Sequence, residues 1–204
     1  MTTIYFIRHS KFDRRMVKTK NETLPLTKEG INYARHMFNN KELMNIDALY
    51  SSEFLRTKQT AKIISDYNNN IKINVSGLIN ERAKGNAHDV PSSFWDTQLI
   101  DENAKTIGGE SRKEVSNRML SFVNMVLDKY QGKKIVAVSH AVAITYLLMN
   151  YCELISFDHH KKYRCLKYKD EYLVDGLIEF CDIFKFTFDE NKKLINIERI
   201  QEKN

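Results

Sequence analysis

Two short apolar runs stand out along the chain, and each leads into a histidine. Residues 4–7 (IYFI) run into His9 by way of one arginine, and residues 135–138 (IVAV) run into His140 by way of one serine. Their length and their β-branched content are typical of strands that are buried on both faces, as in a parallel sheet. Two weaker segments predict further strands, at residues 47–50 and 71–75.

The polar positions ahead of the helical patterns are start signals. Thr27, just after Pro25, is placed to cap a first helix. Ser52 is placed to cap a second helix over residues 53–67, whose first turn holds Arg56. We therefore expect helices to follow the first two strands in alternation.

The second half of the chain continues this alternation. Ser111 and Glu114 form a capping-box pattern, and apolar residues then recur at helical spacing on one face up to residue 130. Residues 141–149 suit a buried helix that leaves directly from the strand before it. The pattern predicts an α/β fold, a three-layer αβα sandwich with a mostly parallel central sheet.

Two regions depart from this alternation. Residues 180–188 and 194–200 alternate around a polar turn and predict a C-terminal β-hairpin. Residues 82–110 contain glycines and a proline that interrupt any period, and we expect a mobile or irregular excursion, a kind of loop that often covers a site. The 204 residues hold no repeat and no linker, so we expect residues 1–204 to form a single domain.

Composition narrows the functional classes. The net charge is +6, but much of the excess lies in two basic segments, residues 11–20 and 159–169, without an aromatic-interleaved RNA motif, so we expect no nucleic-acid partner. A basic leader and a long apolar run are both lacking, which indicates a cytoplasmic protein without membrane contact. The three widely spaced cysteines predict reduced thiols.

The candidate chemistry gathers at one edge of the predicted sheet. Parallel strands bring their carboxyl ends together, so Arg8, His9, Arg56 and His140 should meet there. Two imidazoles and two guanidiniums repel one another and are costly to bury without an anion between them. A phosphoryl group would relieve that conflict.

Five segments, taken in order, strengthen this interpretation. They are IRHS at residues 7–10, PLTKEG at 25–30, LYSSEFLRTKQTA at 49–61, LINERAKG at 78–85 with GGES at 108–111, and VAVSHA at 136–141. In these segments the chain resembles the phosphoglycerate-mutase-like branch of the histidine phosphatase superfamily. The resemblance implies a phosphoglycerate mutase-like fold and a metal-independent histidine acid phosphatase, a phosphomonoesterase that needs no cofactor.

The resemblance also implies a role for each site residue. His9 would be the nucleophile that takes the phosphoryl group, while Arg8 and Arg56 hold the phosphoryl oxygens and depress the pKa of His9. His140 would donate to another oxygen, as would the backbone N–H of Ala141. The proton donor would be Glu81, although three other glutamates are also available, Glu53, Glu102 and Glu110. We expect no metal, because the remaining histidines lack carboxylate partners at ligand spacing.

Three positions depart from the family pattern. Ser10 and Ala141 stand where the family usually has glycine, and these small residues still let the backbone approach a phosphate, so both remain in the expected substrate site. Arg15 replaces an asparagine that many members use for the phosphate. With its basic neighbours it suggests that the substrate carries a second negative charge.

Other functions stay open at this point. A mutase would use the same His9 intermediate, but family mutases generally carry a longer insertion after the proton-donor segment. A non-catalytic phosphate-binding regulatory module would keep the fold without turnover. The expected partner is a small-molecule phosphate ester of undetermined identity. A homodimer is also left open, since Tyr163, Tyr168 and Tyr172 either line the pocket, cover a dimer face or do neither.

Overall fold

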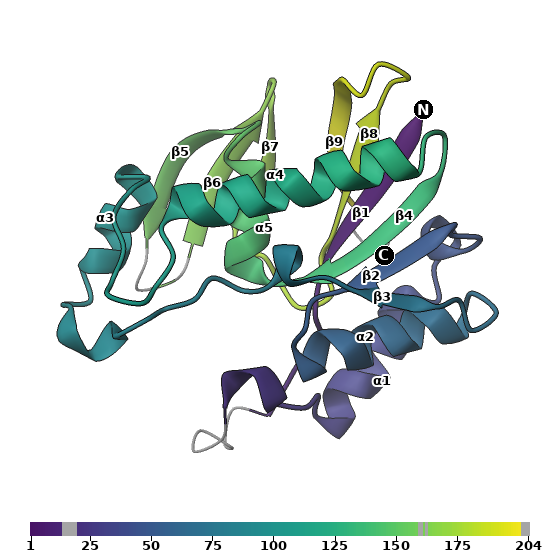
Figure 1. The fold of residues 1–204 in the computed structure, drawn as a ribbon, viewed down its shortest axis with the longest axis horizontal. Coiled ribbons are helices and arrows are strands. Elements are labelled where there is room, and N and C mark those ends of the chain that lie inside the picture. Colours follow the sequence, from purple (N-terminus) through teal and green to yellow (C-terminus); the bar gives the residue numbers. More distant parts are fainter. Residues whose placement is uncertain (14–19, 159–160, 162, 201–204) are drawn as a thin grey trace.

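The structure is a computed structural model that describes residues 1–13, 20–158, 161 and 163–200. Its centre is a six-stranded sheet with the strand order β3-β2-β4-β1-β8-β9 (Figure 1). The four strands on one side are parallel, β8 is antiparallel to its neighbour β1, and β9 is antiparallel to β8. The bounds of these strands are β1 Thr2–Arg8, β2 Ala48–Ser51, β3 Ile73–Val75, β4 Lys134–Ser139, β8 Ile183–Phe188 and β9 Leu194–Ile200. The predicted mostly parallel sheet with a C-terminal hairpin is confirmed.

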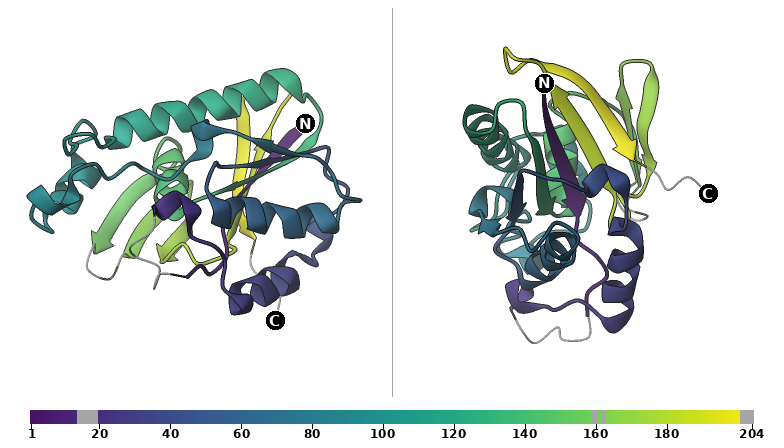
Figure 2. Two further views of the ribbon diagram at one scale, coloured as in Figure 1. Left: turned by 60° about the horizontal axis from the view of Figure 1, so that its bottom comes forward. Right: turned by 90° about the vertical axis from the view of Figure 1, so that its right-hand side faces the viewer.

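Helices cover both faces of this sheet, as the three-layer prediction requires (Figure 2). Helices α1 (Lys28–Phe38) and α2 (Leu55–Asp66) pack on one face, and α4 (Arg112–Lys129) and α5 (Ala141–Leu148) pack on the other. Along β1, Ile4 and Phe6 belong to the apolar cluster on the side of α4 and α5, whereas Tyr5 and Ile7 belong to the cluster on the side of α1 and α2. The apolar run is continuous because both faces of the strand are buried.

The helix starts follow the predicted signals in two places and differ in a third. The Thr27 hydroxyl accepts a hydrogen bond from the Gly30 N–H, and Ser111 and Glu114 complete the predicted capping box. The expected cap at Ser52 is wrong, because α2 begins two residues later than predicted and Phe54 occupies its N-cap position. The Ser52 hydroxyl bonds to His140 and accepts from the Phe54 N–H instead.

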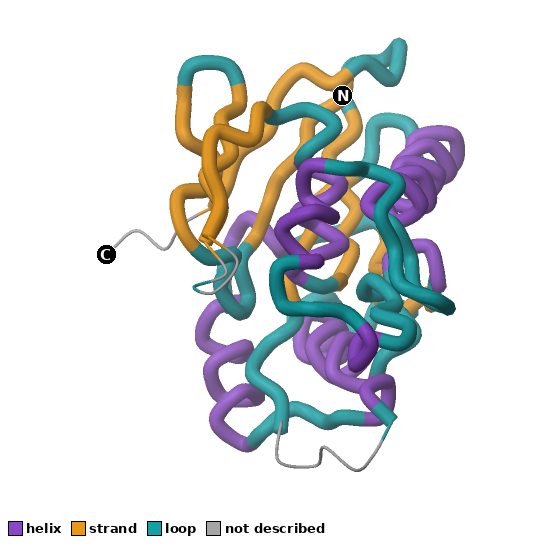
Figure 3. The backbone as a smooth tube through the Cα atoms, turned by 90° about the vertical axis from the view of Figure 1, so that its left-hand side faces the viewer, coloured by secondary structure: helices purple, strands orange, loops and turns teal. Residues whose placement is uncertain are grey.

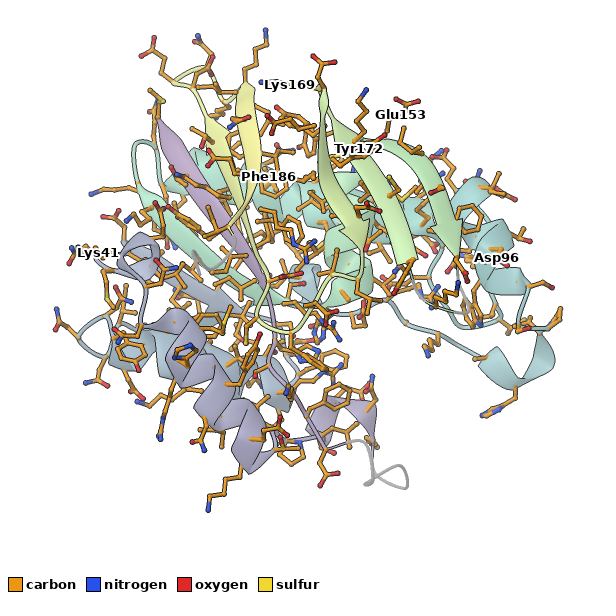
Figure 4. All side chains as sticks on the ribbon, turned by 180° about the vertical axis from the view of Figure 1, so that it is seen from behind. Lys41, Asp96, Glu153, Lys169, Tyr172 and Phe186 are labelled. Atoms are coloured by element: carbon orange, nitrogen blue, oxygen red, sulfur yellow. The ribbon has the colours of Figure 1, made fainter. Side chains whose placement is uncertain are left out.

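A second sheet was not predicted. It contains β5 (Glu153–Asp158), β6 (Tyr163–Tyr168) and β7 (Glu171–Gly176), all antiparallel, and it packs against the α5 side of the core. Its last strand lies beside β9, so the strands of the two sheets are neighbours (orange in Figure 3). Figure 4 marks Tyr172 on this small sheet and Phe186 on the central one. Charged residues interrupt the alternation of apolar and polar residues in these three strands, so the sequence pattern did not predict them.

The excursion at residues 82–110 is mostly irregular, with one short helix that the pattern did not predict, α3 (Phe94–Ile100). Its two ends are held together. The Glu110 N–H donates to the Ala83 carbonyl at 2.9 Å, and Lys84 pairs with Gly109. Gly85 has a φ of 55°, and a Cβ there would come within 2.3 Å of the Gly109 nitrogen. A glycine is therefore needed at position 85, where the two ends of the excursion lie against each other.

Two further findings bear on the composition. Cys152, Cys165 and Cys181 are free thiols, as predicted. Within the described part of the chain, helices long and apolar enough to cross a bilayer are lacking.

Candidate active site

The carboxyl ends of β1, β4 and β2 place two histidines and a serine next to one another. Arg8 pairs with Ser139 across β1 and β4, so the residues that follow, His9 and His140, leave the sheet side by side. Their ring centroids are 5.1 Å apart. Ser52 follows β2 in the same way, and its N–H donates to the Val138 carbonyl at 3.1 Å. The predicted meeting of the strand ends is therefore seen in the structure.

The protonation of His9 follows from its two hydrogen bonds. Nδ1 lies 2.8 Å from the Ser10 carbonyl oxygen, which can only accept, so Nδ1 carries the proton. Nε2 accepts a hydrogen bond from the Arg56 Nε at 3.1 Å. The ring is consequently neutral, with the lone pair of Nε2 directed toward the arginine. That lone pair is the nucleophile a phosphoryl transfer needs.

Arg56 lies at the centre of the constellation and is only 3% exposed. Besides its bond to His9, its Nη2 donates to His140 Nδ1 at 3.3 Å, and its Nη1 donates to the Asn21 carbonyl at 2.8 Å. Burial, with a smaller contribution from the nearby charge of Arg8, lowers its pKa to about 10. The side chain still carries its charge at neutral pH, held against both imidazoles by its own rigid fork.

His140 is fully buried and neutral. Because the guanidinium of Arg56 can only donate, His140 Nδ1 is an acceptor, and its proton lies on Nε2, 2.8 Å from the Ser52 hydroxyl. Burial moves the pKa of His140 well below its usual value, and the charge of Arg56 lowers it further. To donate to a phosphoryl oxygen through Nδ1, as predicted, His140 would first have to gain a proton there.

Aromatic rings pack on the cations of the site. The guanidinium of Arg8 lies 4.0 Å from the centroid of Phe180 and donates to the Ile178 carbonyl. The guanidinium of Arg56 lies between Phe12 and Phe54, at 4.8 and 4.6 Å. Ring faces attract cations, so these contacts offset part of the repulsion among the charged groups. Sequence reasoning missed Phe180, which it had assigned to a strand of the hairpin.

Ser10 ties the loop after His9 to the first helix. Its hydroxyl donates to the Gly30 carbonyl at 2.7 Å, and its N–H donates to the Thr60 hydroxyl at 3.1 Å. A Cβ at Gly30 would lie 2.1 Å from the Lys11 carbonyl oxygen, so only glycine allows this approach. In the structure Ser10 therefore positions the loop after His9, and its contact with a substrate stays a prediction.

Glu81 lies at the N-terminus of α5, the helix that starts directly after His140. Its carboxylate accepts from the N–H groups of Val142, at 3.4 Å, and Ala143, at 3.1 Å. The Ser139 hydroxyl donates to the Ile79 carbonyl at 2.8 Å and so fixes this segment to the end of β4. The helix dipole favours the negative charge there. The role of the Ala141 N–H stays a prediction.

The three alternative glutamates have other partners. Glu110 forms a paired contact with Arg118, at 2.7 and 3.0 Å. Glu102 forms a surface ion pair with Lys113 at 2.8 Å, and Glu53 accepts from the Asn80 amide at 2.6 Å. Of the four glutamates, Glu81 is the one whose carboxylate caps the helix next to His140. Tertiary position thus favours the predicted residue over its competitors.

One predicted site residue lies outside the described part of the chain, and one residue of the site was not predicted. Arg15 lies outside the described residues, so its predicted contact with substrate remains a prediction. Asn21, which accepts from Arg56, was missed because nothing in the sequence around it indicates a site. In the part of the chain that the structure describes, no group of three or more His, Cys, Asp or Glu side chains is arranged to hold a metal ion.

Comparisons with known proteins agree with this geometry. The family model described as "Histidine phosphatase superfamily (branch 1)" matches residues 4–167. Among curated proteins, "Probable phosphoglycerate mutase GpmB" of Salmonella paratyphi A is 25% identical over 156 residues, which are 71% of this chain and 72% of that protein.

Solved structures share the fold at lower identity. YhfR of Bacillus stearothermophilus is 19% identical with a TM-score of 0.73, covering 96% of this chain and 95% of its own. A mycobacterial glucosyl-3-phosphoglycerate phosphatase is 15% identical with a TM-score of 0.71, covering 97% of this chain and 96% of its own. At these identities the structural likeness shows the fold alone.

Proposed function

The chain belongs to branch 1 of the histidine phosphatase superfamily, and from that premise we propose that it is a phosphomonoester hydrolase that transfers its substrate's phosphoryl group to His9. The observation that carries this proposal is the protonation state of His9. Its proton is fixed on Nδ1 by the Ser10 carbonyl, which leaves the Nε2 lone pair for attack.

The proposed first step forms the bond between Nε2 and phosphorus and breaks the bond between phosphorus and the leaving oxygen. The ring then becomes positive, and the Ser10 carbonyl stabilises this charge through the Nδ1 proton. Arg8 and Arg56 would hold the phosphoryl oxygens during the transfer, with Arg56 exchanging its bond to Nε2 for one to an oxygen. In the second step water attacks phosphorus, the bond to Nε2 breaks, and inorganic phosphate leaves.

Glu81 would provide the proton that the leaving oxygen needs and would then accept one from the attacking water. The position of Glu81 supports this role. Ser139 of β4 holds the segment that ends at Glu81, and the Glu81 carboxylate accepts from Ala143, in the first turn of the helix that follows His140. The carboxylate would have to leave the α5 N–H groups to reach the substrate. Those N–H groups would then be free to face the phosphoryl group.

The neutral state of His140 favours activity at acidic pH. A phosphate monoester loses its second proton near pH 6, so below that value the substrate brings a proton into the site. We propose that this proton moves to His140 Nδ1, which then donates it to a phosphoryl oxygen. Part of the lowering of the His140 pKa comes from repulsion by the charge of Arg56, and the phosphate charge would oppose it.

We further propose that the reaction needs no metal and that the enzyme works in the cytoplasm on a small-molecule ester. Arginine forks and imidazoles supply the charge that a metal would otherwise supply to a phosphoryl group. Three free thiols fit a reducing compartment.

The test is phosphate release from an aryl phosphate, with a chelator present, by the wild-type protein and by His9→Ala. Turnover in the wild type that is lost in the variant supports the proposal. Turnover that persists in the variant, or that the chelator abolishes, contradicts it.

Because a curated relative is named as a phosphoglycerate mutase, phosphoglycerate isomerisation should be measured alongside, with and without a bisphosphate primer. Primer-dependent isomerisation without hydrolysis would indicate the mutase, and phosphoester binding without turnover would indicate a regulatory module.

A further inference from the structure

Two arginines from separate elements flank the side of the site where Glu81 lies. Under the proposed function, on which this inference rests, the proton donor marks the position of the leaving group, because it must reach the leaving oxygen. Side chains beside Glu81 therefore meet the part of the substrate that differs from one phosphate ester to another.

Arg82, the first of the two, follows Glu81 in the chain and contacts helix α5 and the excursion. Its Nη1 lies 3.4 Å from the Tyr146 hydroxyl and donates to the Gln98 side chain, and its guanidinium lies 4.2 Å from the Trp95 ring centroid. Its Nε is buried and makes no hydrogen bond to any residue that the structure describes. A buried donor of this kind is costly unless a ligand accepts from it.

Arg164, the second, comes from the sheet that the sequence did not predict. Alternate residues of a strand share a face, so Arg164 lies on the same face of β6 as Leu166, which is fully buried in the core with α5. Opposite it on β7 stands Gly176, which has no side chain to fill the space. The charge of Arg164 acts on Tyr146 and Glu81, and burial lowers its pKa.

We propose that Arg82 and Arg164 form a second anion-binding site on the Glu81 side of the active site, and that the substrate is a phosphate monoester whose leaving group carries a second anionic group. The two guanidiniums repel each other, and an anion between them removes that repulsion. Guanidinium forks bind both carboxylate and phosphate in bidentate geometry. The competing explanation is that both arginines serve only to hold Glu81 and Tyr146 in place.

The experiment compares three esters on the same propyl chain. Propyl phosphate has no second charge, 3-phosphooxypropanoate has a carboxylate, and propane-1,3-diol bisphosphate has a second phosphate. Phosphate release is measured as kcat/KM for the wild-type protein and for Arg82→Gln and Arg164→Gln. Lys167→Gln is the matched control, because it removes the same charge from the same strand β6.

We expect the wild type to prefer at least one charged ester over propyl phosphate by about tenfold or more, since a charge-assisted contact contributes that much. Each arginine variant should reduce this ratio about tenfold, mainly through KM, and Lys167→Gln should leave it unchanged. Arg164→Lys, which keeps the charge but loses the fork, should retain part of it. Which charged ester is preferred identifies the anion as carboxylate or phosphate.

Two results would overturn the inference while leaving the proposed function intact. One is a wild-type ratio near one together with His9-dependent hydrolysis of propyl phosphate. The other is a preference for charged esters that neither arginine variant changes. Equal losses on all three esters in the arginine variants would support the competing structural explanation. Absence of hydrolysis of any ester, including an aryl phosphate, would instead contradict the proposed function.

Discussion

The Nε of Arg56 donates a hydrogen bond to the Nε2 of His9 across 3.1 Å. A cation next to this nitrogen disfavours its protonation, because the imidazolium would be repelled. The same guanidinium contacts His140 through Nη2. One buried arginine thus disfavours protonation of both rings, and it links the two strand ends at which the site is built.

Replacement of His9 by alanine should remove the covalent intermediate. We expect hydrolysis to fall by a factor of about a thousand or more, because the nucleophile is lost. Wild-type protein incubated with 32P-labelled substrate and quenched in alkaline detergent should carry label that is stable in base and labile in acid. His88→Ala, on the exposed excursion, should keep both activity and label. Label on the His9→Ala protein would contradict the assignment.

Arg56→Gln should slow catalysis far more than it weakens folding. The variant loses the donors to both imidazoles and the charge that faces the phosphoryl group, and we expect kcat to fall about 100-fold to 1000-fold. Steady-state kinetics measure this loss. Arg35→Gln removes an exposed arginine from helix α1 and should have no effect on kcat. A loss of less than threefold in Arg56→Gln would show that the phosphoryl group is held elsewhere.

Glu81→Gln should reveal the proton donor through its dependence on the leaving group. An alkyl oxygen needs a proton to leave, whereas 4-nitrophenolate leaves without one, so the variant should lose about 100-fold or more on an alkyl phosphate and much less on 4-nitrophenyl phosphate. Glu102→Gln, which breaks only a surface ion pair, is the control. Equal losses on the two substrates would assign Glu81 to binding rather than to proton transfer.

His140 should make the stability of the fold depend on pH. Its folded pKa lies below the unfolded value near 6.5, so the unfolded chain takes up a proton that the folded chain refuses. This contribution to stability is present above pH 6.5 and is lost as the pH falls below it. The free energy of unfolding should therefore decrease by up to about 1.4 kcal/mol per pH unit from this group.

Urea unfolding between pH 5 and pH 7.5 measures this slope. His140→Gln should make it shallower by the contribution of one proton, although its stability at pH 7 will also be lower. His36→Gln, on the exposed face of helix α1, should leave the slope unchanged. An identical slope in the wild type and in His140→Gln would mean that His140 is protonated in the folded state.

The sequence alone determined the architecture of the central sheet and which residues meet at the carboxyl ends of its strands. Buried strands read as continuous apolar runs, capping residues mark helix starts, and parallel strands must bring their ends to one edge, so His9, His140 and Arg56 were predicted together. These are local or topological rules, and they need no knowledge of distant contacts. Ser52 was mistaken for a cap because a hydroxyl in that position satisfies either role.

Only the tertiary structure decided how these residues are used. The Nε2 atom of His9 accepts from Arg56, which lies 47 residues away in the sequence, and the choice among four glutamates depended on which of them reaches helix α5. The small sheet that carries Arg164 escaped prediction because Leu166 is the one fully buried residue of β6, which leaves only a weak alternation of apolar and polar residues. Hydrogen-bond geometry and burial arise from chain segments brought together by folding, and no local pattern encodes them.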